Sequence, residues 1–188
     1  MPKILYVNAC VRKESRTNRM AQFVLKKLAG EVREVRLEDE QIMPLDAALL
    51  QERNELIAQN NFTNPSFKYA KQLAEADVLV VGAPYWDLSF PALLKIYLER
   101  INVQGLVFRY REDGSVQSFC HAKQLIYVTT AGGPIIEPNL GYEIVKQMAQ
   151  SFFGVSQFAY YKAEGLDIIG ADIEKILQEA EAKISLKY

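Results

Sequence analysis

A buried strand that ends in two aromatic residues is the feature that most constrains this sequence. The segment from Asp77 to Trp86 reads DVLVVGAPYW, and no polar side chain occurs between Val78 and Ala83. Such an unbroken run is typical of a strand in a parallel sheet with helices on both faces. Gly82-Ala83-Pro84 ends the strand, and Tyr85 and Trp86 follow at its carboxyl end, where ligands bind in open α/β sheets. We therefore expect a flat aromatic ligand beside these two rings.

Strands and helices alternate along the whole chain. The other strands are predicted at Lys3 to Asn8, Glu31 to Leu37, Lys123 to Thr130 and Gln157 to Ala163. Apolar residues at the helical period predict helices between them. The first of these follows Thr17, and the later ones span Leu49 to Gln59, Ser66 to Ala76, Phe90 to Gln104, Tyr142 to Phe153 and Ala171 to Ile184. We expect Ile144 and Ile173 to face the core, and Gly30 to end the first helix at its C′ position.

This alternation predicts the fold class. Five βα units with no internal repeat or linker favour one α/β domain over residues 1–188, a doubly wound parallel sheet with right-handed crossovers. Five strands favour the flavodoxin-like order 2-1-3-4-5, with the switch point between the first and third strands. A small hairpin insertion is predicted from Val107 to Tyr110 and from Val116 to Phe119, joined by an Asp-Gly turn. The loops after strands 1, 3 and 4 are then expected to share one edge.

Composition excludes several classes of function. Apolar residues make up 49% and charged residues 24% of the chain, and the net charge is −1, which favours neither nucleic acid nor an anionic membrane. No apolar run is long enough to span a membrane. With one histidine, His121, and two distant cysteines, Cys10 and Cys120, a zinc site and a disulfide framework are not expected. No signal peptide is recognised, so we expect a cytoplasmic protein.

The loop after the first strand offers a phosphate-binding site. It contains neither GxGxxG nor a P-loop, but Ser15, Thr17 and Asn18 stand at the start of a helix, with Arg16 and other basic residues nearby. Hydroxyl groups, free backbone N–H groups and the helix dipole together bind phosphate. The alternative is that these residues only cap the helix, as Ser, Thr and Asn commonly do.

The loops after the third and fourth strands complete the candidate site. Tyr85, Trp86 and Asp87 follow the third strand, although they could instead pack beneath the hairpin or at a subunit contact. The fourth strand ends in Thr129 and Thr130, and then Gly132 and Gly133 would let backbone amides approach a planar ligand. A plain tight turn would use the same glycines. A phosphate site, an aromatic platform and an amide cradle at one edge together suit flavin mononucleotide (FMN).

Four stretches of the chain resemble the FMN-dependent NAD(P)H:quinone oxidoreductases and azoreductases of the flavodoxin-like superfamily. They are Ser15 to Asn18, APYW at Ala83 to Trp86 followed by Leu93-Leu94-Lys95, VFRYREDG at Val107 to Gly114, and TTAGG at Thr129 to Gly133. Ala163-Glu164-Gly165 extends the resemblance, which covers nearly the whole chain.

The resemblance implies a set of FMN contacts. They are Cys10, Ser15, Arg16, Thr17 and Asn18 around the phosphate, and Pro84, Tyr85, Trp86, Asp87, Leu88, Thr130, Ala131, Gly132 and Gly133 around the ring system. Two positions depart from the family pattern, which often has serine where Cys10 stands and asparagine where Asp87 stands. Relatives are dimers with sites at the interface, so the resemblance also implies a homodimer whose hairpin reaches the partner subunit.

The hypothesis that follows is ping-pong catalysis, in which NADH or NADPH reduces FMN and a quinone, azo or nitro compound then takes two electrons. The cofactor supplies the chemistry and the protein positions it, so no side chain is assigned as catalytic, and His121 is expected to have no such role. A flavodoxin-type electron carrier and a non-catalytic regulatory or partner-binding protein of the same fold are the alternatives. A serine hydrolase is disfavoured, because no GxSxG motif occurs.

Overall fold

A single parallel sheet forms the centre of the molecule. The computed structural model describes residues 1–185, and its main strands are β1 (Lys3–Asn8), β2 (Glu31–Arg36), β3 (Val78–Gly82), β6 (Gln124–Thr130) and β7 (Gln157–Ala163). They pair in the order β2-β1-β3-β6-β7, all parallel. This confirms the predicted flavodoxin-like order, because β6 and β7 are the fourth and fifth sheet strands along the chain. The chain therefore reverses its direction of winding between β1 and β3.

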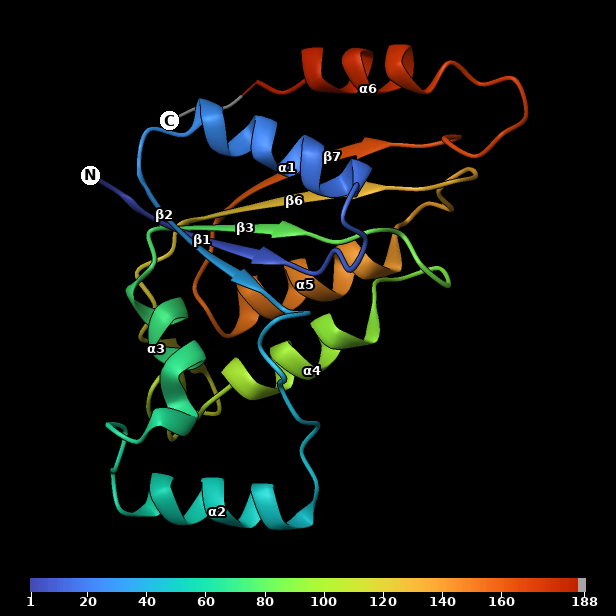
Figure 1. Cartoon of the computed structure of the whole chain (residues 1–188). Coiled ribbons are helices and arrows are strands. Elements are labelled where there is room, and N and C mark those ends of the chain that lie inside the picture. Colours follow the sequence, from blue (N-terminus) through green and yellow to red (C-terminus); the bar gives the residue numbers. More distant parts are fainter. Residues whose placement is uncertain (186–188) are drawn as a thin grey trace.

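Helices cover both faces of the sheet. α1 (Arg16–Lys27) and α6 (Ile173–Ala182) lie on one face, and α3 (Lys68–Glu75), α4 (Ala92–Ile101) and α5 (Leu140–Ser151) lie on the other (Figure 1). The two faces bury separate apolar clusters, one against α1 and α6 and the other against α3, α4 and α5. No helix within residues 1–185 combines the length and the apolar character needed to cross a membrane.

The central strands are apolar at every position because both of their faces are covered. In β3, Val78 and Val80 pack in the cluster beneath α1, whereas Leu79 and Val81 pack in the opposite cluster. Side chains alternate between the faces of a strand, so an unbroken apolar run supplies both cores at once. Full burial of each such side chain contributes roughly 1.5–3 kcal/mol. This burial holds the carboxyl ends of the central strands in place beneath the connecting loops.

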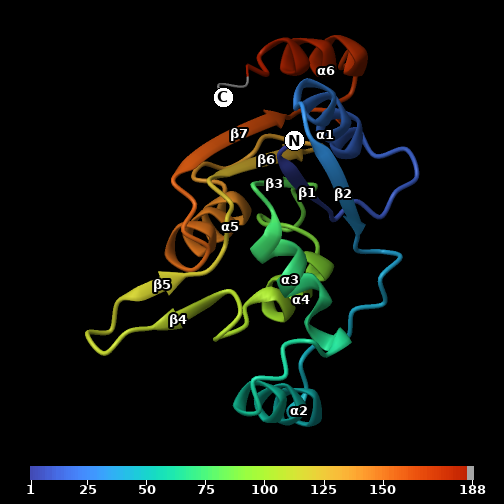
Figure 2. The ribbon, with the colours of Figure 1, turned by 90° about the vertical axis from the view of Figure 1, so that its left-hand side faces the viewer.

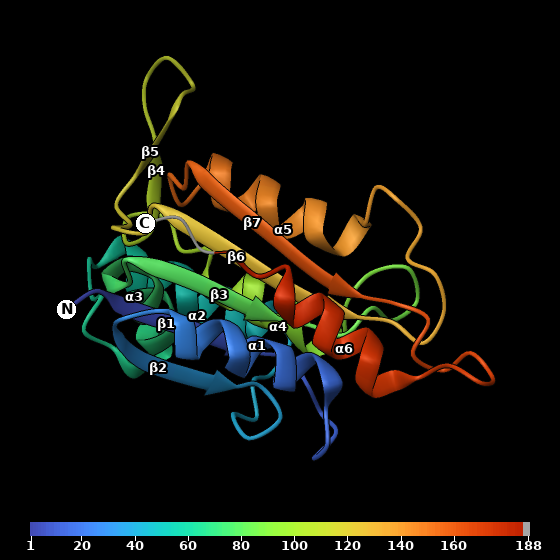
Figure 3. The same cartoon turned by 90° about the horizontal axis from the view of Figure 1, so that it is seen from above.

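The smaller elements project from this core. The predicted hairpin forms from β4 (Phe108–Tyr110) and β5 (Val116–Ser118), and it extends away from the body of the molecule (Figures 2 and 3). Gly114 adopts φ +81° in its turn, as an Asp-Gly turn requires. α2 (Ala47–Ala58) lies on the outer side of the α3 and α4 layer and buries none of its residues (Figure 1). A 3₁₀ turn, η1 (Pro65–Phe67), leads into α3.

Two residues expected in the core are exposed. Ile144 is 42% exposed because α5 turns Gly141, Val145 and Ala149, spaced four residues apart, toward the sheet. Ile144 therefore lies about 100° around the helix from this buried row. Ile173 is 36% exposed at the first position of α6, one turn before the helix reaches its buried residues. Both predictions were wrong because periodicity alone does not fix how a helix is rotated against a sheet.

The expected role of Gly30 also needs correction. The helix ends at Leu28, which caps α1 in an extended conformation, and Gly30 does not adopt a positive φ. Glycine is required there for space, because a Cβ atom would lie 2.6 Å from the carbonyl oxygen of Pro2 and 2.7 Å from Ile4 Cδ1. The residue thus allows the chain to pass closely beside β1 as it enters β2.

Candidate functional site

A cleft of about 280 Å³ lies at the carboxyl ends of the central strands. Four loops border it, and they follow β1, β3, β6 and β7. Its position beside the switch point between β1 and β3 is the place where ligands bind in doubly wound sheets. The lining residues are Val11, Arg12, Glu14, Ser15, Arg16, Thr17, Pro84, Tyr85, Trp86, Thr130, Ala131, Gly132, Leu166 and Asp167.

The structure brings together most of the residues predicted to contact a ligand. Nine of them line the cleft, namely Ser15, Arg16, Thr17, Pro84, Tyr85, Trp86, Thr130, Ala131 and Gly132. The other five lie outside its lining, namely Cys10, Asn18, Asp87, Leu88 and Gly133. The three loops singled out in the sequence thus converge at one edge.

The N-terminus of α1 supplies donors for an anion. Ser15 caps the helix, and its hydroxyl oxygen accepts a hydrogen bond from the Asn18 N–H at 3.1 Å. The Arg19 N–H bonds to the Ser15 carbonyl. The N–H groups of Arg16 and Thr17 precede these bonds, and neither has a partner within residues 1–185. Free N–H groups at a helix N-terminus, together with the helix dipole, favour a bound phosphate. Ser15 therefore caps the helix as its capping interpretation predicted, and the next two N–H groups stay available to an anion.

A buried hydrogen bond links two of the predicted loops. Thr17 Oγ1 lies 2.7 Å from Thr130 Oγ1, and both residues are buried. One hydroxyl must donate to the other, so each can still offer a lone pair or a proton to a ligand. The contact fixes the first turn of α1 against the end of β6. It thereby sets the distance between the anion site and the amide groups of the β6 loop.

Hydrogen bonds from β1 hold the side chain of Asn18. Its side-chain Oδ1 accepts hydrogen bonds from the Tyr6 hydroxyl at 2.8 Å and from Asn8 Nδ2 at 3.4 Å. Asn8 Nδ2 also donates to Glu34 Oε1 at 2.8 Å. Burial strongly raises the pKa of Tyr6, so its hydroxyl stays protonated and can donate. Asn18 thus anchors α1 to β1, and its side chain is directed inward rather than into the cleft.

Cys10 lies beneath the same helix terminus. Its backbone N–H donates to Asn8 Oδ1 at 3.0 Å, and its Sγ lies 3.7 Å from the carbonyl oxygen of Gly82. Burial raises the pKa of the thiol to about 11, partly offset by a hydrogen bond involving Ser15. A neutral, 2% exposed thiol packs the loop from below and offers no charge to a ligand.

The loop after β3 makes a tight turn that exposes Trp86. Trp86 and Ser89 exchange backbone hydrogen bonds, and the two residues between them, Asp87 and Leu88, have φ values of +49° and +66°. Two successive positive φ values define a type I′ turn, which favours Asn and Gly. Leucine in this conformation is strained. The turn leaves Trp86 38% exposed at the wall of the cleft.

Tyr85 connects the same loop to β6. Its backbone N–H donates to the Thr130 carbonyl at 2.9 Å, and its hydroxyl accepts a bond of 3.4 Å from the Ile136 N–H. The aromatic loop and the threonine-glycine loop are therefore joined by backbone hydrogen bonding. Tyr85 lines the cleft as a fixed wall.

The loop after β7 contributes residues that the sequence did not single out. Leu166 and Asp167 line the cleft, and so do Val11 and Glu14 from the first loop. The Asp167 N–H donates to the Gly132 carbonyl at 2.8 Å, and a Cβ atom on Gly132 would lie 2.3 Å from Asp167 Oδ2. The Ala163-Glu164-Gly165 resemblance pointed to this loop. No residue pattern indicated that the two positions after Gly165 face the cleft.

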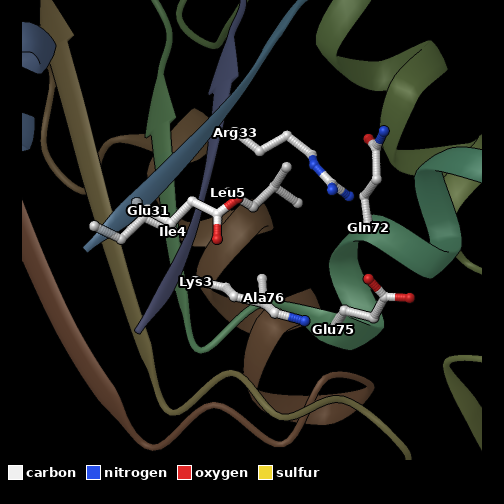
Figure 4. A pocket seen from close by; sticks show the side chains of 8 residues that line it. All are labelled: Lys3, Ile4, Leu5, Glu31, Arg33, Gln72, Glu75 and Ala76. Atoms are coloured by element: carbon white, nitrogen blue, oxygen red, sulfur yellow. The ribbon is translucent and has the colours of Figure 1, made fainter. Parts of the chain in front are cut away.

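A second cavity lies at the opposite, amino end of the sheet. It measures about 40 Å³ and is bordered by β1, β2 and α3, as Figure 4 shows. Its lining residues are Lys3, Ile4, Leu5, Glu31, Arg33, Gln72, Glu75 and Ala76. This volume admits about one water molecule. His121 lies exposed at this same end, just before β6, and is remote from the cleft.

The residues of the cleft fit a flavin nucleotide. Free N–H groups and Arg16 suit a phosphate, and the exposed Trp86 ring suits a planar ring system. Gly132 also lines the cleft, and its lack of a side chain leaves room for the Asp167 carboxylate. The lining carries Arg12 and Arg16 as well as Glu14 and Asp167, so its charge is mixed.

Comparison with known proteins agrees with this geometry. A family model described as flavodoxin-like fold matches residues 2–187. A protein of Coprothermobacter proteolyticus named FMN-dependent NADH:quinone oxidoreductase is 35% identical over 196 residues, covering 96% of this chain and 94% of its own length. FMN-dependent NADH:quinone oxidoreductase 2 of Clostridium acetobutylicum is 41% identical over 120 residues, which cover 62% of this chain and only 60% of that protein.

A solved structure supports the fold. An FMN-dependent NADH-azoreductase from Bacillus anthracis, determined in complex with FMN, superposes with a TM-score of 0.79. It is 20% identical, and the superposition covers 97% of this chain and 95% of that one, which shows a shared fold. Together with the family model and the full-length relative, this establishes that the chain belongs to the flavodoxin-like fold family, among proteins named FMN-dependent NADH:quinone oxidoreductase.

Proposed function

We propose that this protein is an FMN-dependent NADH oxidoreductase that reduces quinones or azo compounds by two electrons. The observation that carries the proposal is the convergence of an anion site at α1, the exposed Trp86 and the glycine loop after β6 on one cleft. The full-length relative with 35% identity supports the same activity. When bound, FMN would supply the redox chemistry, taking hydride from NADH and passing electrons to the acceptor.

The chain's own residues would bind and orient the cofactor. The N–H groups of Arg16 and Thr17 and the Arg16 guanidinium would hold its phosphate. Trp86 would set the plane of the ring system by stacking. The backbone N–H groups of Gly132 and Gly133, which have no partner within residues 1–185, would stabilise negative charge at the edge of the ring, because fixed amide dipoles need no reorganisation. None of these roles requires a side chain to transfer a proton.

The proposal includes a homodimer, supported by exposed apolar residues beside the cleft. Leu88, Ile136, Leu140 and Ile144 are 42–61% exposed. They lie on adjoining segments, because the start of α5 packs against the β3 loop at Ser89 and the Ile136 N–H bonds to Tyr85. A contiguous apolar patch of this kind marks an interface. Tyr110, 53% exposed on the projecting hairpin, would also contact the second copy.

Light scattering would test the dimer. Ile144→Glu introduces a charge into the patch without entering the core, and we expect it to convert a dimer into a folded monomer. Glu179→Ala, on the exposed face of α6, is the control and should leave the mass unchanged. A monomeric wild-type protein at micromolar concentration would contradict this part of the proposal.

The proposal also includes a cytoplasmic location, supported by two cysteines that are both free and buried. Free thiols persist in a reducing compartment. Fractionation of the native host cells, with the protein recovered in the cytoplasmic fraction, would support this assignment.

Anaerobic mixing of the FMN-loaded protein with NADH tests the activity. We expect the visible absorbance of the flavin to bleach and then to recover when menadione is added. Repeated turnover of NADH with excess menadione should follow, whereas free FMN at the same concentration provides the background rate.

The possible outcomes separate the alternatives. Bound flavin that stays oxidised in NADH would contradict the enzyme and favour an electron carrier of the flavodoxin type. A protein that purifies without colour and takes up no added FMN would favour a non-catalytic regulatory or partner-binding protein.

A further inference from the structure

An ion pair spans the mouth of the cleft. Arg16 Nη1 donates to Asp167 Oδ1 at 2.7 Å and to the Leu166 carbonyl oxygen at 3.1 Å. Arg16 is the first residue of α1, and Asp167 lies in the loop after β7, so the pair joins segments about 150 residues apart in the sequence. Both residues line the cleft. The side chains are 34% and 63% exposed, so solvent screens the attraction between them.

Only one of the guanidinium nitrogens is used in this contact. Both bonds to the β7 loop come from Nη1, and Nε and Nη2 of Arg16 have no partner within residues 1–185. A guanidinium has five N–H groups in a planar fork, and the remaining ones can bind a phosphate in a bidentate manner. Arg16 is thus held from one side and is free on the other.

Asp167 is itself firmly placed. Its N–H bonds to the Gly132 carbonyl, and its carboxylate lies where a side chain on Gly132 would be. The neighbouring Leu166 N–H bonds to the Ala131 carbonyl, and the Gly165 N–H bonds to the Gly133 carbonyl. Three successive backbone bonds therefore tie this segment to the loop after β6. The carboxylate that holds Arg16 is anchored to the loop that forms the opposite side of the cleft.

We propose that Asp167 is a positioning residue, which fixes the Arg16 guanidinium in the orientation that binds the phosphate of the cofactor. The inference rests on the proposed function, because it concerns the same cleft and the same cofactor. A long arginine side chain loses conformational entropy when it is immobilised on a ligand. Asp167 and the Leu166 carbonyl impose this order before the ligand arrives, so the bound phosphate is released more slowly.

Electrostatic repulsion between Asp167 and the phosphate would have the opposite effect on FMN release. A carboxylate beside a phosphate repels it, so removal of Asp167 would tighten binding if repulsion dominated. We expect positioning to dominate, because the direct 2.7 Å contact is with Arg16 and because the 63% exposed carboxylate is well screened from charges that are farther away. The two effects have opposite signs in the rate of FMN release.

The experiment measures FMN release from the full chain by the recovery of flavin fluorescence after dilution. Asp167→Ala should speed release about three- to fivefold, the range of an exposed ion pair. Asp167→Asn keeps an oxygen that can accept from Arg16 Nη1, and it should stay within about twofold of wild type. Arg16→Ala should speed release at least about tenfold, because it removes charge-assisted hydrogen bonds.

The double variant shows whether Asp167 acts through Arg16. In the Arg16→Ala background, Asp167→Ala should have no further effect on the release rate. Glu179→Ala is the control, because it removes an exposed carboxylate on α6 that lies outside the lining of the cleft. It should not speed FMN release. Thermal melting of each apoprotein checks that all variants are folded.

Two results would overturn the inference while leaving the proposed function intact. One is slower release from both Asp167→Ala and Asp167→Asn, as repulsion requires. The other is an Asp167→Ala effect that persists undiminished in the Arg16→Ala background. A wild-type protein that binds no FMN would instead overturn the proposed function, and the inference with it.

Discussion

The two ends of the sheet are built from the same strands but differ in what their backbone groups bind. At the amino end, the backbone N–H groups that enter β1 and β2 are paired: the Lys3 N–H donates to Asp77 Oδ2, and the Glu31 N–H donates to the Pro2 carbonyl. The cavity there measures about 40 Å³. At the carboxyl end, a cleft of about 280 Å³ is lined by Arg16 and Thr17, whose backbone N–H groups have no partner in the part of the chain that the structure describes.

The loop after β3 and the connection before β7 also differ in backbone strain. At the amino end, the connection before β7 adopts a positive φ at Gly154, where glycine accommodates it without strain. At the carboxyl end, Asp87 and Leu88 take up that conformation as non-glycine residues. Unpaired donors and strained turns reduce stability, and they persist where a binding site uses them. We therefore interpret the amino end as a closed part of the fold and the carboxyl end as the candidate ligand site.

Glycine substitutions give the largest expected contrast. Gly132→Leu should lower FMN affinity by about 100-fold, because its side chain displaces Asp167 and occupies the cleft. Gly30→Ala at the amino end should instead lower the free energy of unfolding by about 1–3 kcal/mol, since its Cβ meets the Pro2 carbonyl. FMN titration and denaturant unfolding of both variants measure the two effects. Equal losses of affinity in both would break the comparison.

The second-largest expected effect is that of changing Trp86. Trp86→Ala should lower FMN affinity by about tenfold, because stacking of a planar ring on an aromatic side chain contributes about 1–3 kcal/mol. Trp86→Phe retains a ring and should recover most of the affinity. Fluorescence titration with FMN provides the measurement. Unchanged affinity in Trp86→Ala would mean that the ring serves only the subunit contact.

Relief of strain in the same turn should have a smaller effect. Leu88→Gly should raise the free energy of unfolding by about 0.5–1 kcal/mol, because glycine adopts φ +66° without a steric penalty. Asn60→Gly is the control, since asparagine already tolerates its φ of +53°. Urea unfolding compares the two variants. A destabilised Leu88→Gly protein would show that the turn is not strained.

The smallest effect concerns an ion pair at the edge of the cleft region. Lys162 Nζ lies 2.8 Å from Glu137 Oε1 and lowers the pKa of that carboxyl. A carboxyl whose pKa is lowered by folding contributes stability above its unfolded pKa, near 4.5, and loses it as the pH falls through the folded value. Glu137→Gln should therefore cost about 0.5 kcal/mol at pH 7 and nothing near pH 3. Urea unfolding of both proteins at each pH measures this loss. If the variant loses the same free energy of unfolding at both pH values, the ion pair is not the cause.

Much of this architecture could be predicted from the sequence. β1 and β7 begin and end at the predicted residues, and the strand order is the flavodoxin-like one that five βα units favoured. Apolar runs such as Val78 to Val81 indicate the central strands, because a strand that is covered on both faces is apolar at every position. The rotation of α5, which exposes Ile144, depends on packing between distant residues and is not encoded in its periodicity.

The candidate site could be predicted where its local sequence is unusual. Trp86 and the paired glycines stand out because a core strand has no need of them. Asp167 does not stand out, because its role arises only when the loop after β7 lies against Gly132. The inward direction of Asn18, on α1, likewise depends on Tyr6, which lies on β1.

The central claim is that the carboxyl end of the sheet binds FMN with its phosphate at the start of α1. A crystal structure of the protein grown with FMN tests it most directly. We predict electron density for the phosphate within hydrogen-bonding distance of the Thr17 N–H and the Arg16 guanidinium, with the ring system beside Trp86. Density for FMN elsewhere, or a cleft filled by the protein's own side chains in the complex, would contradict it.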